Sequence, residues 1–145
     1  MSRFIDTKIR PGLDIDLALR SMLQRALAGA GVRVDLDFPG VDRLPSVSAM
    51  RAGGLADWPD GQVERPRIEI NAWAKKLSEA INLCLEVVAF LRSSEGTVVT
   101  FGDGARLLLA ATDDDAGLYT DTDPTGAFRA TYTVFLTVQQ LTPTR

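Results

Sequence analysis

Arg65-Pro66-Arg67-Ile68-Glu69-Ile70-Asn71-Ala72-Trp73-Ala74, followed directly by Lys75 to Arg92, is the stretch that decides the fold. Apolar and polar side chains alternate from Arg67 to Asn71, which predicts a strand with one buried face. After Trp73 the apolar spacing lengthens to three and four residues, which predicts a helix with one apolar stripe. The stripe comprises Leu77, Ile81, Cys84, Leu85, Val88 and Leu91, with Ala80 and Val87 beside it. A strand therefore leads directly into a long helix.

The composition around this stretch is that of one soluble globular domain. The chain has 145 residues, of which 46% are hydrophobic and 24% are charged, the usual proportions for such a domain. No stretch approaches the roughly 20 apolar residues of a membrane span, and the first residues lack the apolar core of a secretory signal. Cys84 is the single cysteine. Its place on the apolar stripe indicates a core residue, and no disulfide within the chain is expected.

The net charge of −3 is unevenly distributed. Residues 1–75 carry 11 basic and 10 acidic side chains, whereas residues 76–145 carry 5 and 9. Because phosphate contacts require clustered Lys and Arg, this distribution argues against specific nucleic-acid binding.

Two segments precede the decisive stretch. A helix follows Pro11-Gly12, with apolar residues from Ile15 to Ala30 on one face and Gly29 and Gly31 as its stop signal. Alternation over Val32 to Phe38 then predicts a strand. From Pro39 to Pro66 the chain is rich in Pro and Gly. We expect a long loop at about 39–66 with one short strand, Ser46 to Arg51, and such loops are usually functional or disordered.

The segments after the long helix read as strands. Thr97 to Phe101 and Arg106 to Thr112 flank a Gly102-Asp103-Gly104 turn and predict a hairpin. An acidic connection over residues 113–123 follows, and Phe128 to Leu141 is a long amphipathic strand whose second face is rich in Thr. We predict a single α+β domain over residues 1–145. Its sheet is mixed and mostly antiparallel, with about five or six strands, and both helices pack on one face.

The sequence offers little material for catalysis. There is no histidine, so the commonest general base and metal ligand is absent. A Ser or Cys nucleophile has no obvious base, and no zinc site can form from the usual ligands. One alternative is a small metal-dependent enzyme, in which acidic side chains gather Ca²⁺ or Mg²⁺. Its candidate ligands are Asp113, Asp114, Asp115, Asp121 and Asp123.

The spacing of these aspartates fits no EF-hand loop, and we favour a solvated acidic loop over an ion site. We therefore predict a protein that is not an enzyme, with no catalytic residue, cofactor or resident metal.

The remaining candidates for a functional site are two contact surfaces. One is the 39–66 loop with Leu55, Trp58 and Arg65, and the other is the outer face of the last strand with Arg129 and Phe135. The alternative interpretation is that each surface covers its own core.

The order of segments resembles the tail terminator and tail completion proteins of long-tailed bacteriophages. The likeness rests on Leu44-Pro45-Ser46-Val47-Ser48-Ala49-Met50-Arg51 before Gly53-Gly54, on Arg67 to Ala74 entering a helix with Glu79-Ala80, and on Phe128 to Val138. It covers nearly the whole chain. These motifs reflect packing, and the family has no catalytic residue to transfer.

The resemblance implies an α/β sandwich whose copies assemble as a hexameric ring. Such a ring caps the tail tube, ends its polymerisation and presents the surface that joins tail to head. The implied partners are further copies of the chain, the major tail tube protein and a head–tail connector or head completion protein. DNA would pass only as cargo, along a channel that the acidic residues 113–123 could line. The implied location is the virion, after assembly in the host cytoplasm. A head completion or neck connector protein is the alternative within this class.

Overall fold

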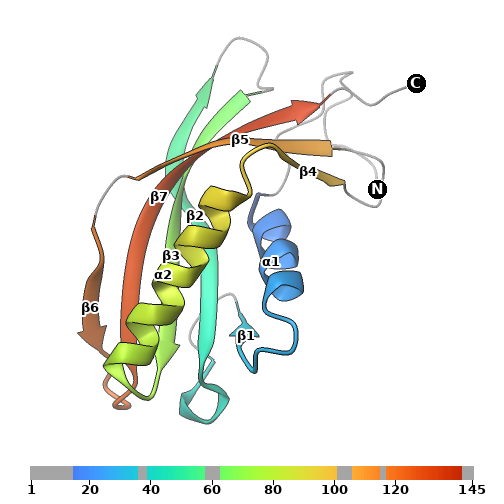
Figure 1. Ribbon diagram of the computed structural model, residues 1–145. Helices are drawn as coiled ribbons and strands as arrows, with labels where there is room; N and C mark the ends of the chain where they lie inside the picture. Colours follow the sequence, from blue (N-terminus) through green and yellow to red (C-terminus); the bar gives the residue numbers. More distant parts are fainter. Residues whose placement is uncertain (1–14, 36–38, 58–62, 101–105, 115–116, 142–145) are drawn as a thin grey trace, which may run out of the picture.

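The computed structural model has two helices packed on one face of a curled, mixed sheet (Figure 1). It describes residues 15–35, 39–57, 63–100, 106–114 and 117–141. The elements in chain order are α1 (Ile15–Ala26), β1 (Arg33–Val34), the 3₁₀ turn η1 (Val41–Arg43), β2 (Ser46–Asp57), β3 (Val63–Ala74), α2 (Leu77–Ser93), β4 (Thr97–Thr100), β5 (Arg106–Asp114), β6 (Tyr119–Thr122) and β7 (Phe128–Leu141). The predicted α+β class is therefore confirmed.

The sheet is built around its last strand. The strand order is β1-β2-β3-β7-β5-β4, and β6 also pairs with β7. β1 and β2 are parallel, whereas the other described pairs are antiparallel. Along one edge β7 pairs with β3. Along its other edge it pairs first with β6, over Phe128 to Thr131, and then with β5, from Val134 to Leu141. β6 and β5 therefore follow one another beside the same strand.

The strand-to-helix join is present as predicted. β3 ends at Ala74 and α2 begins at Leu77, so only Lys75 and Lys76 separate them. The predicted stripe, however, is wrong at two positions, because the side chains of Leu77 and Leu85 are 41% and 44% exposed. The buried face consists of Ala80, Leu83, Cys84, Val87, Val88 and Leu91. A helix lying on a sheet buries only one side, so a stripe this wide extends beyond the contact.

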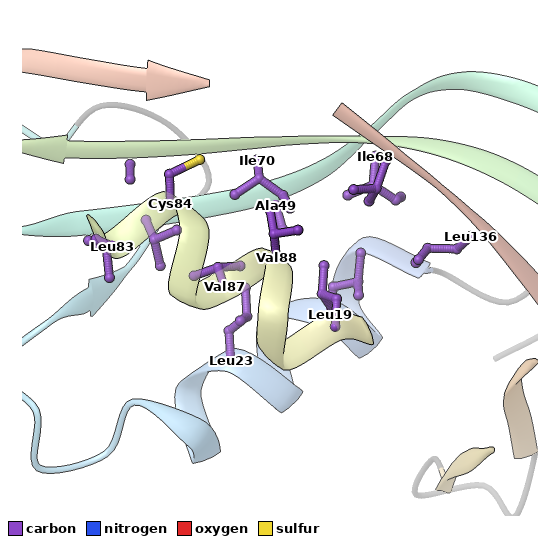
Figure 2. Packing of buried hydrophobic residues seen from close by; sticks show 14 of the residues in the cluster. Leu19, Leu23, Ala49, Ile68, Ile70, Leu83, Cys84, Val87, Val88 and Leu136 are labelled. Atoms are coloured by element: carbon purple, nitrogen blue, oxygen red, sulfur yellow. The ribbon is translucent and has the colours of Figure 1, made fainter. Parts of the chain in front are cut away.

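The core lies between the helices and the sheet. It draws on both helices and on β2, β3, β5 and β7. Figure 2 shows part of this packing, with Leu19 and Leu23 of α1 near Val87 and Val88 of α2. The stop signal predicted for the first helix is also confirmed. α1 ends at Ala26, and Gly29 and Gly31 adopt positive φ angles of 82° and 73°, which other residues rarely adopt.

The long loop predicted at about 39–66 is wrong for most of that range. β2 continues to Asp57 and β3 begins at Val63, so the two strands form a hairpin. Two features accommodate the Gly and Pro residues. The register of β2 shifts between Arg51 and Gly54, and Pro66 lies where no pairing with β7 is formed. Gly and Pro are tolerated in strands at such interruptions.

Two other predicted boundaries also change. The acidic connection at 113–123 is not a continuous loop, because β5 includes Asp113 and Asp114 and β6 includes Asp121. Pairing with β7 holds these residues in strands despite their low β propensity. The strand expected over Val32 to Phe38 is assigned only at Arg33–Val34, and residues 36–38 lie outside the described part.

The helix register predicts a sharp difference between two leucines of α2. Leu91 is fully buried, whereas Leu85 is 44% exposed. Leu91→Ala should lower the free energy of unfolding by about 2–5 kcal/mol, because it leaves a cavity in the core. Leu85→Ala, the matched control, should cost less than about 1 kcal/mol. Urea denaturation followed by circular dichroism measures both. Equal losses would show that the helix is rotated from the position described.

Candidate functional site

Among the described residues we find neither a cluster of metal ligands nor an accessible thiol. Among them, no group of three or more His, Cys, Asp or Glu side chains is placed to hold a metal ion. The thiol of Cys84 lies in the core, where desolvation raises its pKa to about 12. At neutral pH this thiol stays protonated and out of contact with solvent, so it is a poor nucleophile. Neither described helix is long and apolar enough to cross a membrane.

The face of the sheet that lies opposite the helices, which we call the second face, carries mostly polar side chains, and several of them are buried. Alternation along the strands brings its side chains to this side. The buried members are Ser46, Ser48, Asn71, Trp73, Thr131 and Thr133. Trp73 is only 4% exposed. The expectation that the outer face of the last strand is a contact surface therefore fails at Thr131 and Thr133, which are buried within the subunit.

Hydrogen bonds connect this buried polar row across strands. Thr131 Oγ1 donates to Asn71 Oδ1 at 2.7 Å, and Asn71 Nδ2 donates to Glu69 Oε1 at 2.9 Å. At the β1 end, Ser46 Oγ donates to Asp35 Oδ2 at 2.8 Å. Ser48 Oγ is buried and has no hydrogen-bond partner in the structure as described. Of these bonds, the one between Thr131 and Asn71 joins β7 to β3, and it favours the observed register of that pair.

The acidic residues do not form one cluster. Asp121 of β6 accepts two hydrogen bonds from the guanidinium of Arg129, and this contact raises the pKa of Arg129. Asp123 accepts hydrogen bonds from the hydroxyl and the backbone N–H of Thr125, and these bonds lower the pKa of the Asp123 carboxyl. Both carboxylates therefore have local structural partners.

For two of the other three aspartates the structure gives a strand position without side-chain contacts. Asp113 and Asp114 belong to β5, in register with Phe135 and Val134 of β7. Asp115 lies outside the described residues. A metal site made from the five aspartates gains no support from this arrangement, because Asp121 and Asp123 are engaged separately.

The predicted contact residues are spread along the sheet. Leu55 and Arg65 pair across the β2–β3 hairpin, and the Arg65 side chain is exposed. Trp58 lies outside the described residues. Phe135 is half-buried on the second face, and Arg129 is six residues away on the same strand, which is roughly 20 Å. The structure therefore does not bring these residues together into one site.

An apolar surface that the sequence did not predict lies along α2. It comprises Leu77, Ile81 and Leu85 of the helix with Phe128 and Tyr132 of β7, and we call it the α2 flank. Its helical residues are spaced by four, so they follow one side of α2. Arg92 Nη2 contacts the Tyr132 hydroxyl at 3.5 Å, which places this side of α2 over β7. In Figure 1, α1 lies on the opposite side of α2.

The sequence feature that could have indicated the α2 flank is the large number of apolar positions on α2. One helix side cannot bury eight such positions against a single sheet, so some of them had to face outward. Sequence alone does not decide which ones, because that choice depends on the rotation of the helix.

A shallow groove lies between the C-terminal parts of the two helices. It has a volume of about 240 Å³ and is lined by Met22, Arg25, Ala26, Phe90, Ser94 and Thr97. Pockets for drug-sized ligands are typically larger, about 300–1,000 Å³, and bury most of the ligand. The groove therefore gives no indication of a small-molecule substrate.

Comparison of the sequence with protein-family models and with curated proteins finds no match.

The buried polar row predicts a specific loss of stability. Thr131→Val removes the hydroxyl that donates to Asn71 Oδ1 and leaves that buried oxygen without its partner. The free energy of unfolding should fall by about 1–3 kcal/mol. Thr137→Val, on the same strand and half-buried, should change it by less than about 0.5 kcal/mol. Thermal and urea denaturation provide the comparison, and a neutral Thr131→Val would mean that the row contributes nothing to the register.

Proposed function

We propose that this chain is a structural virion protein that caps the tail tube of a long-tailed bacteriophage as a hexameric ring. The observation that supports the proposal best is the β3–α2 join within its fold. The join sits in a curled, mostly antiparallel sheet with both helices on one face. This is the architecture that the resemblance implies, with the join at the predicted residues. The proposal needs no metal, cofactor or catalytic residue.

The mechanism would be steric and energetic. A ring of subunits would cover the exposed end of the tube and remove the surface on which the next tube ring adds. A head-to-tail contact repeated around a rotation axis closes such a ring. Its affinity would come from apolar side chains and strand edges spread over a large interface.

The distribution of charge fits a channel that lets DNA pass without binding it. Asp113 and Asp114 fall on β5, Asp121 falls on β6 and Asp123 follows it, and both strands pair with β7. Like-charge repulsion from such residues would keep phosphates from adhering. Asp121 would contribute least to this repulsion, because Arg129 neutralises it.

Electron microscopy of the purified chain mixed with polymerising tail tube protein tests the proposal. We expect rings at tube ends and arrested elongation, so that tubes become shorter as the ratio of chain to tube protein rises. A strictly monomeric chain that fails to bind tube ends would exclude the assignment.

A head completion protein, the alternative, would bind the connector and leave tube length unchanged. Absence of the chain from purified particles by mass spectrometry would exclude both virion roles.

Two neighbouring positions on β7 separate assembly from folding. Val134 is fully buried against the helices, whereas Phe135 is half-buried on the second face. Val134→Asp should cost more than about 4 kcal/mol and abolish folding, because it places a carboxylate in the core. Phe135→Asp should cost at most about 2 kcal/mol and reduce binding to tube ends. Melting temperature and a tube-pelleting assay measure the two effects. A collapse in melting temperature for Phe135→Asp would instead assign that side chain to the subunit interior.

A further inference from the structure

We infer that Asp16 of α1 closes the outer edge of β2 and thereby prevents a strand of a second copy of the chain from pairing there. The outer edge is the side of β2 that faces away from β3. The inference concerns the single subunit, so it does not depend on the proposed role at the tail tube.

The outer edge of β2 is only partly covered by a strand. β2 has 12 residues, whereas β1, its partner on this edge, has two. Their pairing ends at Val47, whose carbonyl accepts a hydrogen bond from the Asp35 N–H at 3.0 Å. Beyond Val47, no described strand continues along this edge. The backbone N–H and C=O groups of such an edge are a template on which another chain can add a strand.

A side chain takes the place of the missing strand at Arg51. The Arg51 backbone N–H donates to Asp16 Oδ1 at 2.6 Å, and both residues are partly buried. Backbone groups alternate along a strand, so Arg51, four residues after Val47, also directs its N–H to the outer edge. An added strand would have to replace the carboxylate with a neutral carbonyl, which is a weaker acceptor.

The position of α1 holds this carboxylate at the edge. Asp16 lies in the first turn of α1, and Ile15, Ala18 and Leu19 around it are buried in the core. Figure 1 shows α1 and β1 on the same side of β2. The positive end of the helix dipole also favours a negative charge in the first turn. Asp16 is therefore fixed by the packing of its helix, and an incoming strand must displace it from a favourable site.

The other parts of the sheet edge are limited by different means. β4 and β6 have four residues each, and short edge strands pair weakly with other chains. The part of β5 beyond its pairing with β4 ends in Asp113 and Asp114, and charged residues on an edge disfavour pairing. On β2, a register shift between Arg51 and Gly54 interrupts the regular strand. The regular stretch between β1 and this shift is the one that Asp16 protects.

Two substitutions of Asp16 test the inference by hydrogen exchange. Asp16→Ala removes the acceptor, whereas Asp16→Asn keeps an oxygen acceptor and removes only the charge. The Arg51 amide should exchange with solvent at least about tenfold faster in Asp16→Ala, and within about threefold of the wild type in Asp16→Asn. NMR spectroscopy measures both rates. The amide of Ile70, in the central strand β3, is the reference, because its exchange reports loosening of the whole sheet.

Sedimentation velocity tests the consequence for association. At equal concentration, Asp16→Ala should form larger species than the wild type, and Asp16→Asn should sediment like the wild type. Asp42→Ala, which removes an exposed acidic charge from η1, is the matched control for net charge and should also sediment like the wild type. In Asp16→Ala, a higher protein concentration should slow exchange at Arg51 again, because the added strand supplies a new acceptor.

Three results would overturn the inference. Equal acceleration at Arg51 and Ile70 would mean that Asp16 only stabilises the fold. Self-association of Asp16→Asn or Asp42→Ala to the same extent as Asp16→Ala would assign the effect to charge and not to the hydrogen bond. An Asp16→Ala chain that exposes the Arg51 amide but sediments like the wild type would show that a second copy does not bind the open edge. None of these results bears on tube capping, which is tested with the wild-type chain.

Discussion

The fold depends on the pairing of β7 with strands on both of its edges. β3 runs along one side over nearly its whole length, and β6 and β5 share the other side. Because side chains alternate along a strand, a slip of one residue would exchange Val134 and Leu136 in the core for Thr133 and Phe135. The buried hydrogen bond between Thr131 and Asn71 favours the observed register. Once β7 is in register, the helix face and the second face of the sheet are both determined.

Local sequence patterns predicted those helices and strands in which apolar residues recur at a regular spacing. The predicted strand Phe128 to Leu141 agrees with β7 at both ends, and the passage from strand to helix at Trp73 was found to within a few residues. The 39–66 segment could not be predicted in this way. Its Pro and Gly residues are typical of loops, but pairing with β3 and a change of register keep most of the segment in strands. Such pairing depends on residues elsewhere in the chain, which local propensity does not include.

The sequence predicted some of the candidate surface residues correctly and missed others. Phe135 and Arg129 were correctly placed on the face away from the helices, because alternation alone decides the side of a strand. The expectation that this face is open failed at its centre, where Thr131 and Thr133 are buried. The α2 flank was missed because Leu77 and Leu85 fit the helical period as well as Leu91 does. Periodicity identifies the apolar residues of a helix, but the contact with the sheet determines which of them remain exposed.

The position of β7 in the chain also affects biosynthesis. It is the last described strand, yet it lies in the middle of the sheet. While the ribosome is still producing residues 128–141, β3 and β5 lack the partner that joins them, and the helices have only part of the surface on which they pack. The nascent chain therefore cannot complete its core from the N-terminus onward, and closure must await the release of β7. Until β7 emerges, the β3 edge that it covers is unpaired, and an unpaired strand edge of this kind is a site at which neighbouring chains can pair.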